Sequence, residues 1–148
     1  MFLHVDKPDT MQTEQVHITA TGLEPERIYT ITMTVKHNYG THSATATFRS
    51  NSAGYIDLQT DAPIRGTYSG VEPMGLFLSQ RPLEDFAFGG YLRCTPPVPF
   101  YYDLFLFDEK DNKIDSMTIK KHWMHPKLER TEIAHDGFYG TLFKPPGE

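Results

Sequence analysis

Apolar and polar residues alternate along most of this chain, and this period of two limits its fold more than any other feature. Between residues 29 and 35, four large apolar side chains alternate with three threonines. Side chains two apart point to the same face of a strand, and β-branched residues suit a pleated surface. The same alternation predicts strands at residues 15–20, 43–48 and 55–58.

The second half of the chain continues this pattern. Residues 100–107 form a long apolar run, which predicts a central strand covered on both faces. Residues 114–123 predict a further strand, and Asp136-Gly137 is a preferred hairpin turn that would join strands at 129–134 and 138–143. About seven to nine short strands with no βαβ rhythm predict an all-β fold, an immunoglobulin-like antiparallel β-sandwich, with a small barrel as the alternative.

Two segments are expected to be irregular. Proline and glycine recur between residues 63 and 75 too closely for a regular helix, although residues 74–78 are compatible with a short strand. Three prolines between residues 96 and 99 predict that residues 89–99 form a loop.

Composition narrows the class of protein. With 148 residues the chain is the size of one domain. Its formal net charge of −5 argues against a nucleic acid or an anionic membrane as ligand. A single cysteine, Cys94, favours a reducing compartment. Without a signal-peptide pattern or a membrane-spanning apolar run, we expect a soluble intracellular protein, whether in the cytosol, a peroxisome or a mitochondrion.

No residues combine into a catalytic or metal site. The glycines of residues 66–70 do not flank Ser69 at the spacing of a nucleophile elbow. His122 and His125 lie three apart on an expected strand and would point to opposite faces. Six basic residues between 110 and 130 are expected to form a solvated strand face. The sequence therefore predicts no catalytic residue, no metal and no cofactor.

One segment is too unusual for a generic sandwich. Residues 66–82, GTYSGVEPMGLFLSQRP, resemble the N-terminal domain of the type I acyl-CoA thioesterases and the related bile acid-CoA:amino acid N-acyltransferase. Residues 16–35, 43–58 and 140–147 resemble the same domain in the same order.

The resemblance implies a function that this chain does not perform alone. In that family an α/β-hydrolase domain follows the sandwich and cleaves or transfers the acyl group of an acyl-CoA. It implies a sandwich at residues 1–143, a linker at 144–148, and the hydrolase domain of the same polypeptide as partner. Eight residues are expected to contact that domain or shape its cleft: Gly66, Tyr68, Gly70, Pro73, Met74, Gly75, Leu76 and Phe77. A free-standing immunoglobulin-like binding module is the alternative, and thioester hydrolysis by these residues alone is disfavoured.

Overall fold

The structure is a computed structural model that describes residues 2–37, 40–84 and 98–147. Its strands are β1 (Leu3–Val5), β2 (Asp9–Met11), β3 (Ile18–Ala20), β4 (Ile28–His37), β5 (Gly40–Arg49), β6 (Ile56–Asp57), β7 (Arg65–Gly66), β8 (Arg81–Pro82), β9 (Phe100–Phe107), β10 (Lys113–His122), β11 (Glu129–His135) and β12 (Phe138–Lys144). One short helix, α1 (Gly75–Leu78), lies between β7 and β8.

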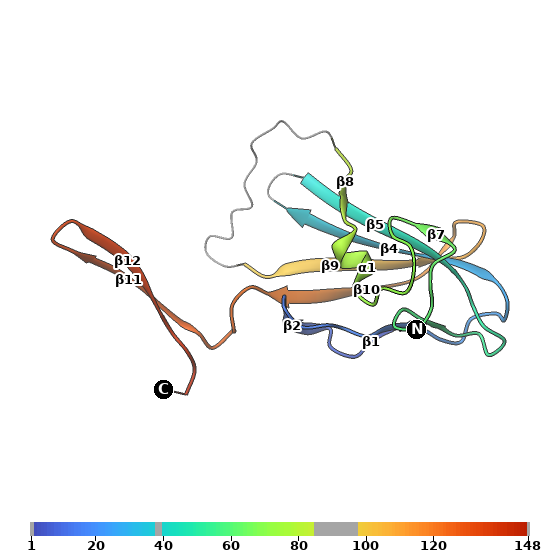
Figure 1. Cartoon of the computed structure of the whole chain (residues 1–148), viewed down its shortest axis with the longest axis horizontal. Coiled ribbons are helices and arrows are strands. Elements are labelled where there is room, and N and C mark those ends of the chain that lie inside the picture. Colours follow the sequence, from blue (N-terminus) through green and yellow to red (C-terminus); the bar gives the residue numbers. More distant parts are fainter. Residues whose placement is uncertain (1, 38–39, 85–97, 148) are drawn as a thin grey trace.

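The strands form a sandwich and a separate hairpin (Figure 1). The larger sheet has the order β2-β10-β9-β4-β5-β7, and β8 also pairs with β5. The smaller sheet has the order β1-β3-β6, and β11 and β12 form a two-stranded sheet. All pairings are antiparallel except that of β2 with β10, which is parallel and aligns Asp9 with Lys120. The predicted β-sandwich is confirmed.

The core follows the alternation. Ile31, Met33, Ala46 and Leu104 of the larger sheet are fully buried, together with Ile18 of the smaller sheet. Burying an apolar side chain of this kind stabilises the fold by about 1.5–3 kcal/mol relative to an exposed position. The hydrophobic effect therefore explains why these sheets close on one another.

Two local predictions were wrong. Within the predicted strand at 74–78, residues 75–78 form α1, because Leu76, Phe77 and Leu78 follow the last glycine and suffice for one helical turn. The Gln80 amide donates to the Leu76 carbonyl at 2.8 Å. Strand β9 is covered on one face only: Leu104 is buried, whereas Tyr101 on the other face is 52% exposed. The second face of a sandwich sheet meets solvent. The predicted loop at 89–99 and Cys94 lie largely or wholly outside the described residues.

The N-terminal residues are hydrogen-bonded to β10. Asp115 Oδ2 accepts hydrogen bonds from the backbone N–H groups of Phe2 and Leu3, at 2.5 and 2.9 Å. The strand register shifts between Lys113 and Asp115, which explains the irregular alternation of this strand. Asp115 therefore links the two sheets.

The β11–β12 hairpin projects away from the sandwich (Figure 1). It was predicted from Asp136-Gly137, and both turn residues have positive φ, 46° and 79°, as that turn requires. Apart from the half-buried Gly140, every described residue of the two strands is exposed. No helix among the described residues has the length and apolar character needed to cross a bilayer.

Candidate functional site

Residues 66–77 lie against the larger sheet and include one tight aromatic contact. Gly66 in β7 pairs with Ala46, and a Cβ at Gly66 would lie 2.3 Å from the Thr45 carbonyl oxygen. A Cβ at Gly75 would lie 2.5 Å from the ring of Tyr68. Both glycines are therefore required by close approach, Gly66 to a neighbouring backbone and Gly75 to an aromatic ring.

Tyr68 covers Gly75 with its ring and buries its hydroxyl. The hydroxyl oxygen has no hydrogen-bond partner among the described residues, and burial raises the pKa of Tyr68 to about 12. A buried hydroxyl without a partner costs free energy relative to a solvated one. Tyr68 is therefore held by packing, and the segment depends on the fit between this ring and Gly75.

Two residues of α1 point into the protein. Leu76 is 1% exposed and belongs to the core. The ring of Phe77 meets that of Tyr102 edge to face, with centroids 5.0 Å apart. Such an aromatic pair contributes about 0.5–1.5 kcal/mol beyond the area it buries. Through these two side chains α1 is anchored to the sandwich.

Beneath Phe77 lies a buried lysine. Lys121 of β10 is 0% exposed, and its ammonium nitrogen is 5.2 Å from the Phe77 ring centroid. That nitrogen donates hydrogen bonds to the carbonyl oxygens of Met11 and Glu14, at 3.2 and 2.5 Å. Burial lowers the pKa of Lys121. The prediction of a solvated basic face was wrong at this position, because backbone carbonyls and an aromatic face replace water around the ammonium.

Further aromatic contacts extend from Phe77 toward the hairpin. The ring of Tyr102 lies 6.3 Å from that of Phe100, and Phe100 lies 5.5 Å from Trp123. Trp123 is 43% exposed and follows the last residue of β10. These successive ring contacts connect α1 with the segment that leads into β11.

The eight predicted site residues thus differ in how exposed they are to solvent. Gly75 and Leu76 are buried, Tyr68, Pro73, Met74 and Phe77 are half-buried, and Gly66 and Gly70 are exposed. Their role at a domain interface stays a prediction. Sequence reasoning did not predict that Lys121 contacts this segment. It also did not predict the contacts of Trp123 and Phe100, for which their aromatic character was the only signal in the sequence.

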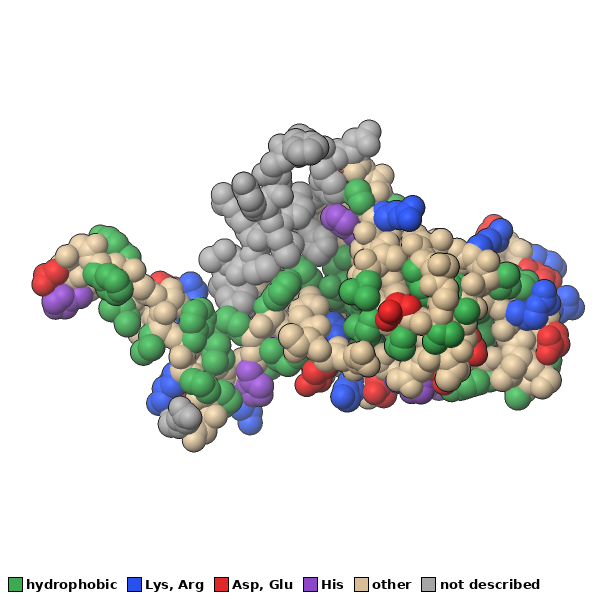
Figure 2. Space-filling model, in the orientation of Figure 1, with side chains coloured by type: hydrophobic (Ala, Val, Ile, Leu, Met, Phe, Trp, Pro, Cys, Tyr) green, Lys and Arg blue, Asp and Glu red, His purple; other side chains and the backbone are tan. Residues whose placement is uncertain are grey.

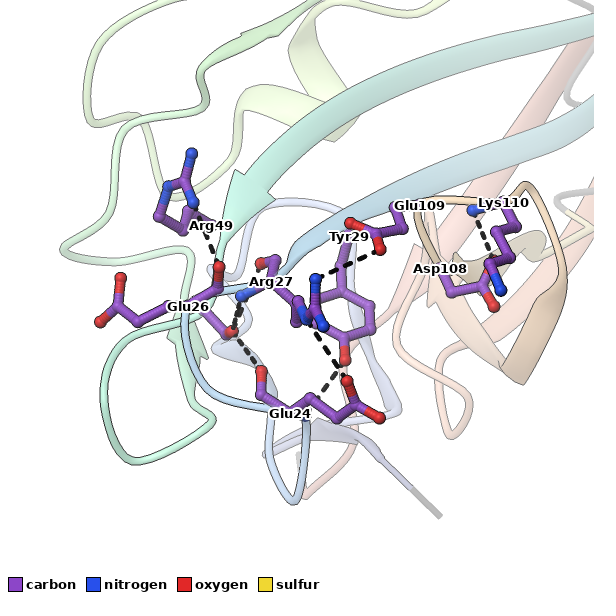
Figure 3. Close-up of polar contacts among 9 residues, drawn as sticks. Glu24, Glu26, Arg27, Tyr29, Arg49, Asp108, Glu109 and Lys110 are labelled. Carbon is purple, nitrogen blue, oxygen red and sulfur yellow. Dashed lines mark hydrogen bonds and ion pairs between the residues drawn. The ribbon is translucent and has the colours of Figure 1, made fainter.

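A polar cleft of about 780 Å³ lies at the end of the sandwich opposite the hairpin. Figure 3 shows Arg27 of this cleft between Glu24 and Glu109, and the guanidinium lies 3.5 Å from each carboxylate. Hydrogen bonds from the Asn112 side chain and backbone lower the pKa of Asp108. Arg27 therefore offsets only part of the charge of Glu24 and Glu109, and Asp108 is held by neutral donors.

The histidines do not assemble a catalytic or metal centre in the described ranges. His17 lies 2.8 Å from Asp57, and His122 lies 2.5 Å from Asp9. His4 contacts the hydroxyl of Thr21. Across the residues that the structure covers, no group of three histidine, cysteine or carboxylate side chains could hold a metal ion.

Comparison with known proteins identifies the family. Residues 13–135 match the model for the acyl-CoA thioester hydrolase/BAAT N-terminal region. The chain is 30% identical over 150 residues to bile acid-CoA:amino acid N-acyltransferase of Mus musculus, an alignment covering 91% of this chain and 34% of that protein. It is 34% identical over 145 residues to acyl-coenzyme A amino acid N-acyltransferase 1 of Mus musculus, with the same coverage, and 31% identical over 139 residues to acyl-coenzyme A thioesterase 3 of Mus musculus, covering 90% and 32%. The chain thus spans about a third of the length of the curated relatives it matches. The sandwich, the family match and these relatives together place the chain in the family of acyl-CoA thioester hydrolase and BAAT N-terminal regions.

Proposed function

We propose that this chain is the N-terminal, non-catalytic domain of an enzyme that hydrolyses an acyl-CoA thioester or transfers its acyl group to an amino acid. The observation that carries the proposal is the alignment of nearly the whole chain with only a third of each relative. The remaining two thirds of such an enzyme would contain an α/β-hydrolase domain with the nucleophile, its histidine base and the orienting carboxylate.

Three described features support a structural role for this domain. The buried side chains form one core between the two sheets, and Arg27 of the polar cleft is held between Glu24 and Glu109. In the described residues, the ring nitrogens of His4, His17 and His122 contact Thr21, Asp57 and Asp9, and none of these partners is a serine. The domain would therefore position a catalytic partner rather than act on the thioester.

The segment at residues 66–78 would face that partner through its outer residues. Val71 and Leu78, which are 53% and 75% exposed, give this region an apolar surface. Three contacts beneath this surface would hold it in place. Gly75 packs against Tyr68, Leu76 lies in the core, and Phe77 contacts Lys121. An apolar surface of this kind is typical of a domain interface.

The test is to compare this 148-residue chain with the protein translated from its complete natural reading frame, using palmitoyl-CoA as substrate. Free CoA thiol should be released by the complete protein and not by the 148 residues alone. Adding glycine would separate the two activities, since a transferase forms an N-acylglycine and a hydrolase forms only the fatty acid. Equal turnover by both proteins, or a reading frame that ends at Glu148, would overturn the proposal.

Location follows from the same proposal. One relative, 30% identical over 140 residues, is named peroxisomal succinyl-coenzyme A thioesterase of Mus musculus. An intracellular site of action agrees with an acyl-CoA substrate, and fluorescence microscopy of the tagged complete protein would test it.

A further inference from the structure

The hairpin formed by β11 and β12 has apolar side chains on both faces. Cross-strand pairing places Ile133, Leu142 and Phe138 on one face. It places Ala134, Tyr139 and Phe143 on the other. Of these, Leu142, Phe138 and Tyr139 are 54%, 67% and 80% exposed. Polar side chains share both faces, with the Arg130–Glu132 ion pair on the second, but large exposed apolar side chains on both faces are typical of a sheet that other elements cover on both sides.

The described sandwich does not cover this hairpin. Figure 2 shows its hydrophobic side chains spread along a narrow arm that stands clear of the main body. A two-stranded hairpin is marginally stable by itself in water, and its outer edges present unpaired backbone groups. The arm is therefore an incomplete sheet.

The family boundary falls inside this hairpin. The match to the N-terminal region ends at residue 135, the last residue of β11, so β12 lies beyond it. After β12, Pro145 and Pro146 lack the N–H donors that further ladder pairing needs. The chain thus leaves the sandwich after β10 and forms the hairpin, whose ladder ends at Lys144.

We propose that β11 and β12 are the first two strands of the sheet of the following domain, and that the domain boundary lies at residues 123–128 rather than at 143. This inference rests on the proposed function, in which further polypeptide follows Glu148. That polypeptide covers both faces of the exposed hairpin and adds strands to one of its edges. The sandwich and the second domain would then be joined by a short segment that begins at Trp123.

The experiment is amide hydrogen exchange, read by mass spectrometry, on the 148-residue chain and on the protein from the complete reading frame. In the short chain, amides of β11 and β12 should exchange close to the unprotected rate. In the complete protein they should exchange at least about 100-fold more slowly, while β4 and β9 should stay equally protected in both. Equal exchange of the hairpin in the two proteins would overturn the inference.

A matched pair of variants sharpens the test. Leu142→Lys and Ile64→Lys each place a charge at a similarly exposed position, 54% on the hairpin and 59% on the sandwich. Both should leave the exchange of β4 and β9 unchanged in the short chain. In the complete protein only Leu142→Lys should restore fast exchange to the hairpin. Unfolding of the sandwich by Leu142→Lys in the short chain would refute the inference, because the hairpin would then be packing on the sandwich.

A second copy of the chain is the other occupant to test. If protection of the hairpin in the complete protein is lost on dilution, in step with dissociation of a dimer seen by sedimentation, the cover is another copy and the inference is wrong. Failure of the proposed function is read separately: a complete protein that protects the hairpin but releases no CoA overturns the proposed activity and leaves the domain boundary standing.

Discussion

Alanine at position 75 would place a methyl group in the space that the Tyr68 ring occupies. The Cβ would lie 2.5–2.6 Å from three atoms of that ring, which is far inside van der Waals contact. The backbone of Gly75 does not have the positive φ that only glycine tolerates, so the conflict is with the ring alone. Gly75→Ala must therefore displace Tyr68.

Two effects of opposite sign determine how much Gly75→Ala changes the free energy of unfolding. Overpacking of this kind costs about 1–3 kcal/mol. Replacing glycine by alanine on a compatible backbone stabilises by about 0.4–1 kcal/mol, because the unfolded chain loses freedom. We expect Gly75→Ala to lower the free energy of unfolding by about 1–2 kcal/mol in the natural background. With Tyr68 already replaced by alanine, the same change should raise it by about 0.5–1 kcal/mol.

Urea denaturation of the four proteins of this double-mutant cycle measures the coupling, which should exceed about 1 kcal/mol. Gly140→Ala is the control: its Cβ would lie 3.3 Å from the Phe138 ring on the exposed hairpin, so its effect should stay within about 0.5 kcal/mol. Additive effects of Gly75→Ala and Tyr68→Ala would refute the argument that this ring is why residue 75 is a glycine.

Two further substitutions test the polar contacts that hold the N-terminus. Lys121→Met keeps an unbranched stem but removes the ammonium donor from the Glu14 carbonyl, whereas the Met11 carbonyl keeps the Glu14 backbone N–H, so urea titration should show a loss of about 1–3 kcal/mol. Because the folded pKa of Lys121 lies below the unfolded value of 10.5, the natural protein should gain stability as pH rises toward 10.5, a gain that Lys121→Met should lack. Asp115→Asn should cost about 1–3 kcal/mol at neutral pH. Burial raises the pKa of Asp115, but hydrogen bonds from Leu3 and Phe2 outweigh it and lower the pKa below 3.8. Its stabilisation should therefore be complete above pH 3.8 and be lost below it, so thermal melts of the Asn variant should depend less on acid; identical acid profiles would contradict this.

Local pattern was enough to predict the long strands. Apolar and polar residues alternate over residues 29–35 of β4 and 43–48 of β5, and the burial of Ile31, Met33, Ala44 and Ala46 follows that alternation. The hairpin was equally predictable, because its register depends on a two-residue turn between adjacent segments. Each of these elements is specified by neighbours in the sequence.

The missed features depend on partners far along the chain. Strand β2 has three residues and no pattern of its own, and it exists because it pairs with β10, more than a hundred residues later. Lysine is rarely buried, so nothing local indicates that Lys121 is. Its surroundings come from two segments distant from it in sequence, one with Met11 and Glu14 and one with Phe77. In the same way, the resemblance singled out residues 66–77, but only the Tyr68 contact explains Gly75.

The contacts that join the first residues to β10 also affect how the domain is made. Strand β1 can pair with β3 early, but the Asp115 contacts of Phe2 and Leu3 and the pairing of Met11 with His122 need β10. During synthesis β2 must therefore wait for nearly the whole sandwich to emerge from the ribosome before it can pair. Contacts of such high sequence separation slow folding, and the newly made chain would depend on chaperones during that interval.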